Sequence, residues 1–236
     1  MEDVGRLPSK ESRVQKLPLS GFEHVRVKPF KPRTERQAQY KELLAGNDLT
    51  FLLGPAGTGK TLLAAAQAIE DLASGRARKI FITRPAREPE DEKLGYLAGP
   101  LDEKMEPRVR PIVAAFERFL DVEAVDDLLG AGIIEIVALA FISGYTFEHA
   151  TVIYDEMQNT TPHMGMLALT RAGRECRLIV TADPAQSLLP AHLDSFAGDL
   201  DRFRGRPGIA FAEFGLADCV RSKLVKQILS AYQNPC

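Results

Sequence analysis

The sequence predicts an α/β fold built on a doubly wound, mostly parallel sheet, and two observations lead to this prediction. Short apolar runs alternate with longer segments of helical period along most of the 236 residues. At one strand-to-helix junction, residues 54–61, the chain carries the phosphate-loop pattern G-x-x-x-x-G-K-[ST]. Ligands of such sheets bind at the carboxyl ends of the strands, so we expect the functional residues there.

The chain is predicted to divide into an extended basic arm, residues 1–34, and a single phosphate-loop domain, residues 35–236. The arm has neither helical nor strand period and contains four prolines. Residues 1–36 carry nine Lys/Arg against five Asp/Glu, although the whole chain has a net charge of −2. A basic arm on an acidic body fits a polyanionic partner such as nucleic acid, and a solvated leader without a partner is the alternative.

Helices and strands are expected in alternation from residue 34 onward. Thr34 and Gln37 fit a capping box that opens a helix ending near Leu44. A strand at 48–53 leads into the phosphate loop, and the helix after it ends near Ser74. The other strands are predicted at residues 79–83, 133–137, 151–154, 178–181 and 209–214. The other helices are predicted at residues 107–120, 122–129, 162–172, 194–203 and 222–232, with residues 84–107 as a long functional loop.

Each residue type in the phosphate loop has a physical task. The glycines let backbone N–H groups turn toward phosphates without a Cβ clash, and the helix N-terminus adds partial positive charge. Lys60 is expected to reach the β- and γ-phosphates, and the Thr61 hydroxyl to ligate Mg²⁺. The predicted nucleotide-binding residues are Gln37, Gly54, Pro55, Ala56, Gly57, Thr58, Gly59, Lys60, Thr61 and Leu62.

The strand at 151–154 ends in two acids, the Walker B pattern. Asp155 is expected to hold Mg²⁺, and Glu156 to orient and activate an attacking water. Polar residues also end the strand at 178–181, where Thr181, Asp183 and Gln186 could sense the γ-phosphate. A strand followed by an acidic helix cap is the alternative for the two acids, and the phosphate loop upstream favours the catalytic interpretation.

Composition argues against several classes of protein. The three cysteines have no paired spacing, so neither a disulfide framework nor a zinc site is indicated. The first residues lack the apolar core of a signal peptide. The most apolar run, residues 133–142, is too short to span a bilayer and contains Glu135. We therefore expect a cytoplasmic protein that has no membrane partner.

Taken together, these motifs resemble the PhoH family of ATPases. The resemblance covers about residues 37–232 and rests on residues 54–61, 83–86, 92–95, 155–162, 169–171, 181–186 and 218–225. It implies a RecA-like core related to superfamily-one helicases, with ATP and Mg²⁺ as ligands and RNA or single-stranded nucleic acid as a partner. It also suggests a homo-oligomeric ring such as a hexamer.

The resemblance also implies roles for single residues. By matching positions it carries over five ATP-site residues, namely Lys60, Thr61, Asp155, Glu156 and Gln186. Gln37 matches the adenine contact of the family. Arg171 and Arg221 are candidate charge stabilisers in catalysis, and Arg84 is a candidate contact to nucleotide or nucleic acid. For each arginine, a role as a surface or helix-capping cation is the alternative.

The chain departs from the family pattern in two places. The family usually has arginines flanking a glycine before the Walker B strand, whereas Ser143 and Tyr145 stand there in this chain. An arginine finger contributes about 10³–10⁵ in rate, so turnover is expected to be slow unless Arg171 or Arg221 substitutes. Residues 87–91 are longer and more acidic than the family loop, which weakens the case for a nucleic-acid path there.

Three functions compete on this sequence. The first is Mg²⁺-dependent ATP hydrolysis coupled to RNA or single-stranded nucleic acid. The second is nucleotide-gated binding with little turnover, which Ser143 and Tyr145 favour. The third is a kinase, which the pair Asp155 and Glu156 argues against because a water-activating Glu would waste ATP. The chain has one phosphate loop and one Walker B strand, and tandem helicases place ATP between two such domains, so we expect self-association to complete the site.

Overall fold

The structure is a computed structural model of the chain. It describes residues 15–85, 110–190, 192–222, 224, 225, 227 and 228. Among these residues, no helix has the length and apolar character needed to cross a lipid bilayer.

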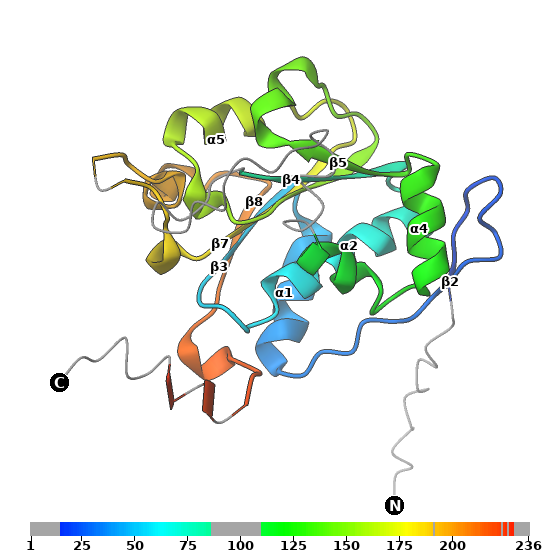
Figure 1. Cartoon of the computed structure of the whole chain (residues 1–236), viewed down its shortest axis with the longest axis horizontal. Helices are drawn as coiled ribbons and strands as arrows, with labels where there is room; N and C mark the ends of the chain where they lie inside the picture. Colours follow the sequence, from blue (N-terminus) through cyan, green and yellow to red (C-terminus); the bar gives the residue numbers. More distant parts are fainter. Residues whose placement is uncertain (1–14, 86–109, 191, 223, 226, 229–236) are drawn as a thin grey trace, which may run out of the picture.

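A six-stranded sheet forms the centre of the molecule (Figure 1). Its strands are β3 (Leu49–Leu53), β4 (Lys79–Arg84), β5 (Ile134–Ala138), β6 (Ala150–Tyr154), β7 (Arg177–Ala182) and β8 (Ile209–Glu213). Their order is β5-β4-β6-β7-β3-β8, and every neighbouring pair is parallel. The predicted α/β fold with a parallel sheet is therefore confirmed, and each predicted strand is present within one or two residues of its expected bounds.

Helices cover both faces of the sheet, as expected for a doubly wound fold (Figure 1). One face carries α1 (Glu35–Gly46), α2 (Lys60–Ala73), a helical segment at 110–116 and α4 (Val122–Gly130). The other face carries α5 (Pro162–Leu169) and the 3-10 helices η1 (Leu139–Gly144) and η4 (Phe196–Phe203). Alternate strand residues enter two separate cores: Leu52 packs under α2, and Phe51 packs on the opposite face.

Three predicted helices differ from the structure. Of the helix predicted over 107–120, residues 110–116 are helical and residues 117–120 form a turn and a bend, while residues 107–109 lie outside the described residues. The segment predicted as a helix over 194–203 is the 3-10 helix η4, which contains Gly198, a weak helix former. The helix predicted over 162–172 ends at Leu169. It stops there because the chain pairs with the segment before β6, where Phe147 N donates to Arg171 O at 2.9 Å. Of the predicted helix 222–232, the described residues 224, 225, 227 and 228 are helical.

Residues 15–34 do not form a free extended arm. Strands β1 (Gln15–Lys16) and β2 (Arg26–Val27) pair antiparallel, and Leu17, Val25 and Val27 are buried in the same core as the apolar residues of α2. These apolar residues are separated by prolines and turns, so they lack the period that marks a strand or helix in sequence. Residues 1–14 of the predicted arm, and most of the predicted loop at 84–107, lie outside the described residues.

Candidate functional site

Most of the predicted site residues meet in or beside one cleft at the carboxyl ends of β3, β6 and β7. The cleft has a volume of about 560 Å³. Its lining includes these predicted residues: Gln37, Ala56, Gly57, Gly59, Lys60, Thr61, Leu62, Glu156, Gln186 and Arg221. In the sheet, β7 lies between β3, which leads into the phosphate loop, and β6, which leads into the two acids. The polar residues that follow β7 are therefore next to both motifs.

The phosphate loop adopts a conformation that requires glycine. Gly54, Gly57 and Gly59 have φ angles of 129°, 81° and 96°, in the region that L side chains rarely adopt. A Cβ at Gly54 would lie 2.3 Å from the Phe214 carbonyl oxygen, and a Cβ at Gly57 would lie 2.5 Å from Arg221 Cγ. The loop is therefore fixed both by its own backbone and by the segments packed on it.

Lys60 folds back over the loop that precedes it. Its ammonium donates to the Gly54 carbonyl at 2.5 Å and to the Pro55 carbonyl at 3.1 Å. Burial lowers the pKa of Lys60, while the charge of Asp183, and more weakly those of Glu156 and Asp155, opposes the shift. The Lys60 ammonium thus lies inside the phosphate loop, and from there it can contact the phosphate of a bound nucleotide.

Asp155 forms the most enclosed part of the site. Its Oδ1 accepts from the Thr181 hydroxyl at 2.5 Å and lies 3.5 Å from Thr61 Oγ1. Burial raises the pKa of Asp155 and the Glu156 charge adds to the shift, while the Thr181 hydrogen bond, Arg84 and Lys60 oppose it. A carboxylate beside a threonine hydroxyl is a hard oxygen donor set, which suits Mg²⁺ held jointly by the protein and phosphate oxygens.

Glu156 has an unusual backbone and a supported carboxylate. Its φ of 57° is in the left-handed region, an uncommon state for a non-glycine residue at the end of a strand. Gln158 Nε2 donates to Glu156 Oε2, and Gln158 Oε1 accepts from the backbone N–H of Asp183 at 3.0 Å. The Arg84 guanidinium lies 3.9 Å from Asp155 Oδ2 and 3.8 Å from Glu156 Oε1. The Glu156 side chain is 34% exposed, so a water molecule can reach it.

Two further polar residues follow β7. Asp183 is buried, and burial raises the pKa of its carboxyl, while the positive charge of Lys60 opposes the shift. Gln186 is exposed at the rim of the cleft, in the 3-10 helix η3 (Pro184–Gln186). Both residues line the cleft that the phosphate loop also lines. This is expected, because the strand that they follow is next to the strand that leads into the loop.

Gln37, the predicted adenine contact, lies against the phosphate loop. Its side-chain Nε2 donates to the Thr58 carbonyl at 3.0 Å, and its Oε1 accepts from the Arg33 backbone N–H at 2.9 Å. Only 2% of its surface is exposed. The adenine contact stays a prediction, and in this structure both ends of the amide are bonded to the protein.

The predicted arginines separate into two groups. Arg221 lies over Gly57, where the neighbouring Val220 N–H donates to the Gly57 carbonyl at 3.0 Å. Arg171 does not line the cleft. The reason is the direction of α5. This helix starts at the carboxyl ends of the strands and runs back toward their amino ends, with a rise of about 1.5 Å per residue. Arg171 therefore lies beside Phe147, ahead of β6.

The two residues that replace family arginines also lie away from the cleft lining. Ser143 is exposed in η1. Tyr145 is half-buried, with its ring centroid 6.1 Å from that of Phe81 and 5.5 Å from that of Phe147. An aromatic cluster thus occupies the position of one arginine.

Sequence reasoning missed two arginines of the cleft. Arg33 lies just before α1, and Arg118 follows the helical segment 110–116. Neither belongs to a recognisable motif, and both reach the cleft through tertiary packing alone. No signal in the sequence could have identified them.

The sequence of this chain is similar to those of known proteins. The model of the family described as PhoH-like protein matches residues 29–233. A PhoH-like protein of Synechocystis sp. is 41% identical over 213 residues, which are 90% of this chain and 63% of that protein. A PhoH-like protein of Bacillus subtilis is 40% identical over 212 residues, which are 89% of this chain and 66% of that protein. The chain thus spans slightly less than two thirds of the length of these curated relatives.

A solved structure shares the fold. One crystal form of the large terminase from a thermophilic bacteriophage superposes with a TM-score of 0.52 and 13% identity, over 86% of this chain and 51% of that one. At this identity the likeness concerns the fold alone. With the strand order and the family match, the predicted RecA-like phosphate-loop core is confirmed as the fold of this chain.

Proposed function

Since this chain belongs to the PhoH family, we propose that it binds ATP with Mg²⁺ and hydrolyses the bond between the β- and γ-phosphates. One observation carries the proposal: the ammonium of Lys60, the hydroxyl of Thr61 and the carboxylates of Asp155 and Glu156 converge on one cleft. Phosphate binding, metal binding and water activation need these groups together.

The phosphate loop and Lys60 hold the triphosphate. Loop N–H groups and the start of α2 bind the β-phosphate region, and Lys60 leaves the Gly54 and Pro55 carbonyls to contact the β- and γ-phosphates. Thr61 and Asp155 would hold Mg²⁺ at the edge of the phosphate loop. When bound, Mg²⁺ neutralises charge on the phosphates and fixes their orientation.

Glu156 acts on the attacking water. Its partly exposed carboxylate orients the water and accepts its proton, a role that contributes about 10²–10⁴ in rate. Gln158 is a positioning residue, since its amide ties the Glu156 carboxylate to the backbone of Asp183. Gln186 at the rim contacts the γ-phosphate or the water.

The arginines complete the site in two ways. Arg221, above Gly57, stabilises charge that develops in the transition state within its own chain. Arg171 lies outside the cleft of its own chain, so its catalytic role requires a neighbouring copy. We propose a homo-oligomeric ring, such as a hexamer, in which one copy supplies a cation to the next. Sedimentation that finds only monomer with full ATPase activity would refute the ring.

ATP turnover is coupled to RNA or to single-stranded nucleic acid in this proposal. The resemblance to superfamily-one helicases and the basic residues near the start of the chain support this part. The alternative function is a nucleotide-gated binding protein with little turnover. Ser143 and Tyr145 favour it, because neither can act as an arginine finger.

The test compares ATP binding and phosphate release, with and without single-stranded RNA. Wild type is expected to bind and hydrolyse ATP, Glu156→Gln to bind ATP but release phosphate at least about 100-fold more slowly, and Lys60→Ala to bind ATP poorly. Glu123→Gln, at an exposed position of α4, is the matched control. Binding without release by both wild type and Glu156→Gln supports the gated binder, whereas absence of ATP binding to wild type rejects the proposal.

The role of the basic residues near the start of the chain is tested by substitution. Residues 1–14 carry three Lys/Arg and three Asp/Glu, so the excess of positive charge lies in residues 15–36. A deletion of that stretch would remove Leu17, Val25 and Val27 from the core and would confuse loss of fold with loss of RNA binding. The variant therefore replaces the exposed residues Lys16, Arg26 and Lys31 by glutamine. RNA stimulation that survives these substitutions assigns the nucleic-acid contact to another surface.

A further inference from the structure

We propose that the site accepts nucleoside triphosphates with little discrimination between bases. This inference rests on the proposed function and deepens it by naming the substrate class. The cleft extends beyond the phosphate loop, and the walls around and beyond the loop offer cationic and apolar surface to a bound nucleotide. Among the described residues, two side-chain amides line the cleft: Gln37, which is bonded to the protein at both ends, and Gln186, which follows β7 on the side assigned above to the γ-phosphate.

Three segments far apart in the sequence build these walls. Arg33 comes from the stretch before α1, Pro111, Ala114 and Arg118 come from the helical segment 110–116 and the turn after it, and Arg221 comes from the segment after β8. The apolar part of the walls can cover a base or ribose without selecting among bases, since dispersion and apolar contact carry no donor or acceptor pattern.

The guanidinium groups of Arg33, Arg118 and Arg221 form no ion pair with the rest of the described chain. Arg177 and Arg204, by contrast, each contact a carboxylate. Cations gathered on one cleft without anionic partners indicate an anionic ligand. A planar guanidinium also stacks on the face of an aromatic ring, and every nucleobase has such a face.

Gln37 is the side chain that could have read adenine, because an amide offers a donor and an acceptor side by side. Both are bonded to the protein here, to the Thr58 carbonyl and the Arg33 N–H. Thr58 is fully buried, so a turn of the amide toward a base would leave its carbonyl without a partner. The amide also packs closely on the loop, since a Cβ at Gly59 would lie 2.8 Å from Gln37 Nε2. We therefore assign Gln37 as a positioning residue for the phosphate loop.

The first experiment measures binding of ATP, GTP, CTP and UTP by calorimetry and their hydrolysis by phosphate release, all with Mg²⁺. The four affinities, and the four kcat/KM values where turnover occurs, are expected to agree within about tenfold. A site that hydrogen-bonds a particular substrate group can discriminate by about 10⁴–10⁵. A preference above about 100-fold for any one base therefore overturns the inference. Tight binding of all four without hydrolysis supports the inference and rejects the proposed hydrolysis, and absence of binding by all four rejects both.

The second experiment separates the two roles of Gln37. If Gln37 positions the loop, Gln37→Ala weakens the binding of all four nucleotides by the same factor. If its amide reads adenine, the variant weakens ATP binding and leaves the other three unchanged, which would contradict the inference. The comparison is internal to one variant, so a small general loss of stability affects the four nucleotides equally and does not obscure the result.

The third experiment tests the stacking surface. Arg118→Ala is expected to weaken binding of all four nucleotides by about 3- to 30-fold, the range of a cation–π contact. Arg110→Ala is the matched control, because Arg110 starts the same described helical segment, pairs with Glu117 at 2.8 Å and does not line the cleft. Equal affinities for Arg118→Ala and Arg110→Ala would overturn the role of Arg118. Arg118 is exposed, and thermal unfolding of each variant verifies that it is folded.

Discussion

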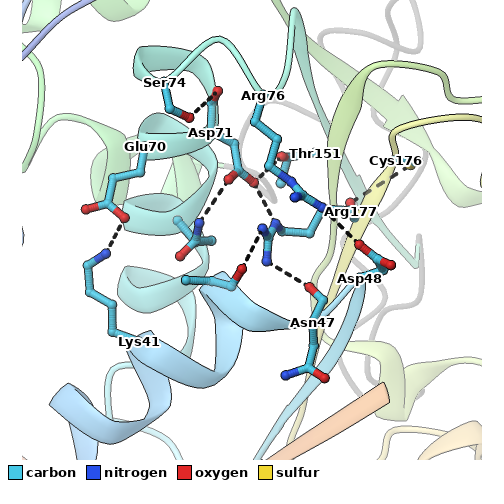
Figure 2. A network of polar contacts seen from close by, with 12 residues as sticks. Lys41, Asn47, Asp48, Glu70, Asp71, Ser74, Arg76, Thr151, Cys176 and Arg177 are labelled. Carbon is cyan, nitrogen blue, oxygen red and sulfur yellow. Dashed lines mark hydrogen bonds and ion pairs between the residues drawn. The ribbon is translucent and has the colours of Figure 1, made fainter. Parts of the chain in front are cut away.

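The Arg177 guanidinium and the Asp71 carboxylate form an ion pair in the interior, with Nε 2.8 Å from Oδ2 and both side chains 3% exposed (Figure 2). The other guanidinium nitrogens donate to the Asn47 carbonyl at 2.8 Å and the Ala45 carbonyl at 3.1 Å. The pair therefore links the end of α1 to α2 and to β7, at the end of the sheet opposite the cleft.

The Asp71→Ala substitution tests the contribution of this pair to stability. Asp71 also accepts hydrogen bonds from the Thr151 hydroxyl at 2.7 Å and from Gln67 Nε2 at 2.9 Å. The substitution leaves the buried Arg177 charge without its anion, so we expect the free energy of unfolding to fall by about 3–5 kcal/mol in urea titrations. The control is Lys28→Ala, which breaks an exposed pair with Asp121 and should cost less than about 1 kcal/mol. Equal losses for the two variants would contradict this expectation.

Asp155→Asn is expected to raise stability at neutral pH while it impairs Mg²⁺ binding. Burial raises the folded-state pKa of Asp155 above the usual 3.8. A raised folded pKa gives stability that is fully present below the unfolded pKa and is lost as the pH rises through the folded pKa. Above the unfolded pKa, burial of this carboxyl therefore costs the folded protein stability, and asparagine avoids the cost because it is neutral at every pH.

The measurement for Asp155→Asn is urea unfolding of both proteins at a series of pH values. The advantage of the variant should be largest near neutral pH and shrink as the pH falls, until below 3.8 the wild-type carboxyl is mostly neutral in both states. Asp126→Asn, at an exposed position of α4, serves as the control. An advantage that does not change with pH would assign the effect to packing instead of ionisation.

Mg²⁺ and ATP together are expected to stabilise the folded protein through Thr61 and Asp155. At a nucleotide concentration of 100 times Kd the gain is about 2.7 kcal/mol, which for a chain of this size raises Tm by roughly 5–11 °C. EDTA should remove the Mg²⁺-dependent part of this shift in thermal unfolding. The Thr61→Ala variant should lack the Mg²⁺-dependent part of the Tm shift and keep the part that ATP gives without metal. A Tm shift in Thr61→Ala that still responds fully to EDTA would exclude Thr61 as a metal ligand.

The sheet was predictable because its strands carry local signals. The buried strands β3, β6 and β7 are mostly apolar runs, and such runs do not depend on distant partners for recognition. The phosphate loop and the two acids were predictable for the same reason, since each is a contiguous motif at the end of a strand. The parallel sheet then brings them together.

The rest of the site depends on tertiary geometry that no short pattern encodes. Arg33 and Arg118 reach the cleft from segments without a motif. The place of Arg171 follows from the length and direction of α5, and a match of sequence positions cannot reveal it. The buried residues before α1, such as Leu17, lie singly between prolines and turns, so the sequence shows neither a helical nor a strand period there.

The walls of the cleft include Arg33, near the start of the described chain, and Arg221, near its end. Contacts between such distant positions close the longest loops of a fold and tend to form late. A chain still emerging from the ribosome would have its complete phosphate loop well before it could hold a nucleotide. Nucleotide binding should therefore be among the last properties to return during refolding, and it should report on completion of the whole domain.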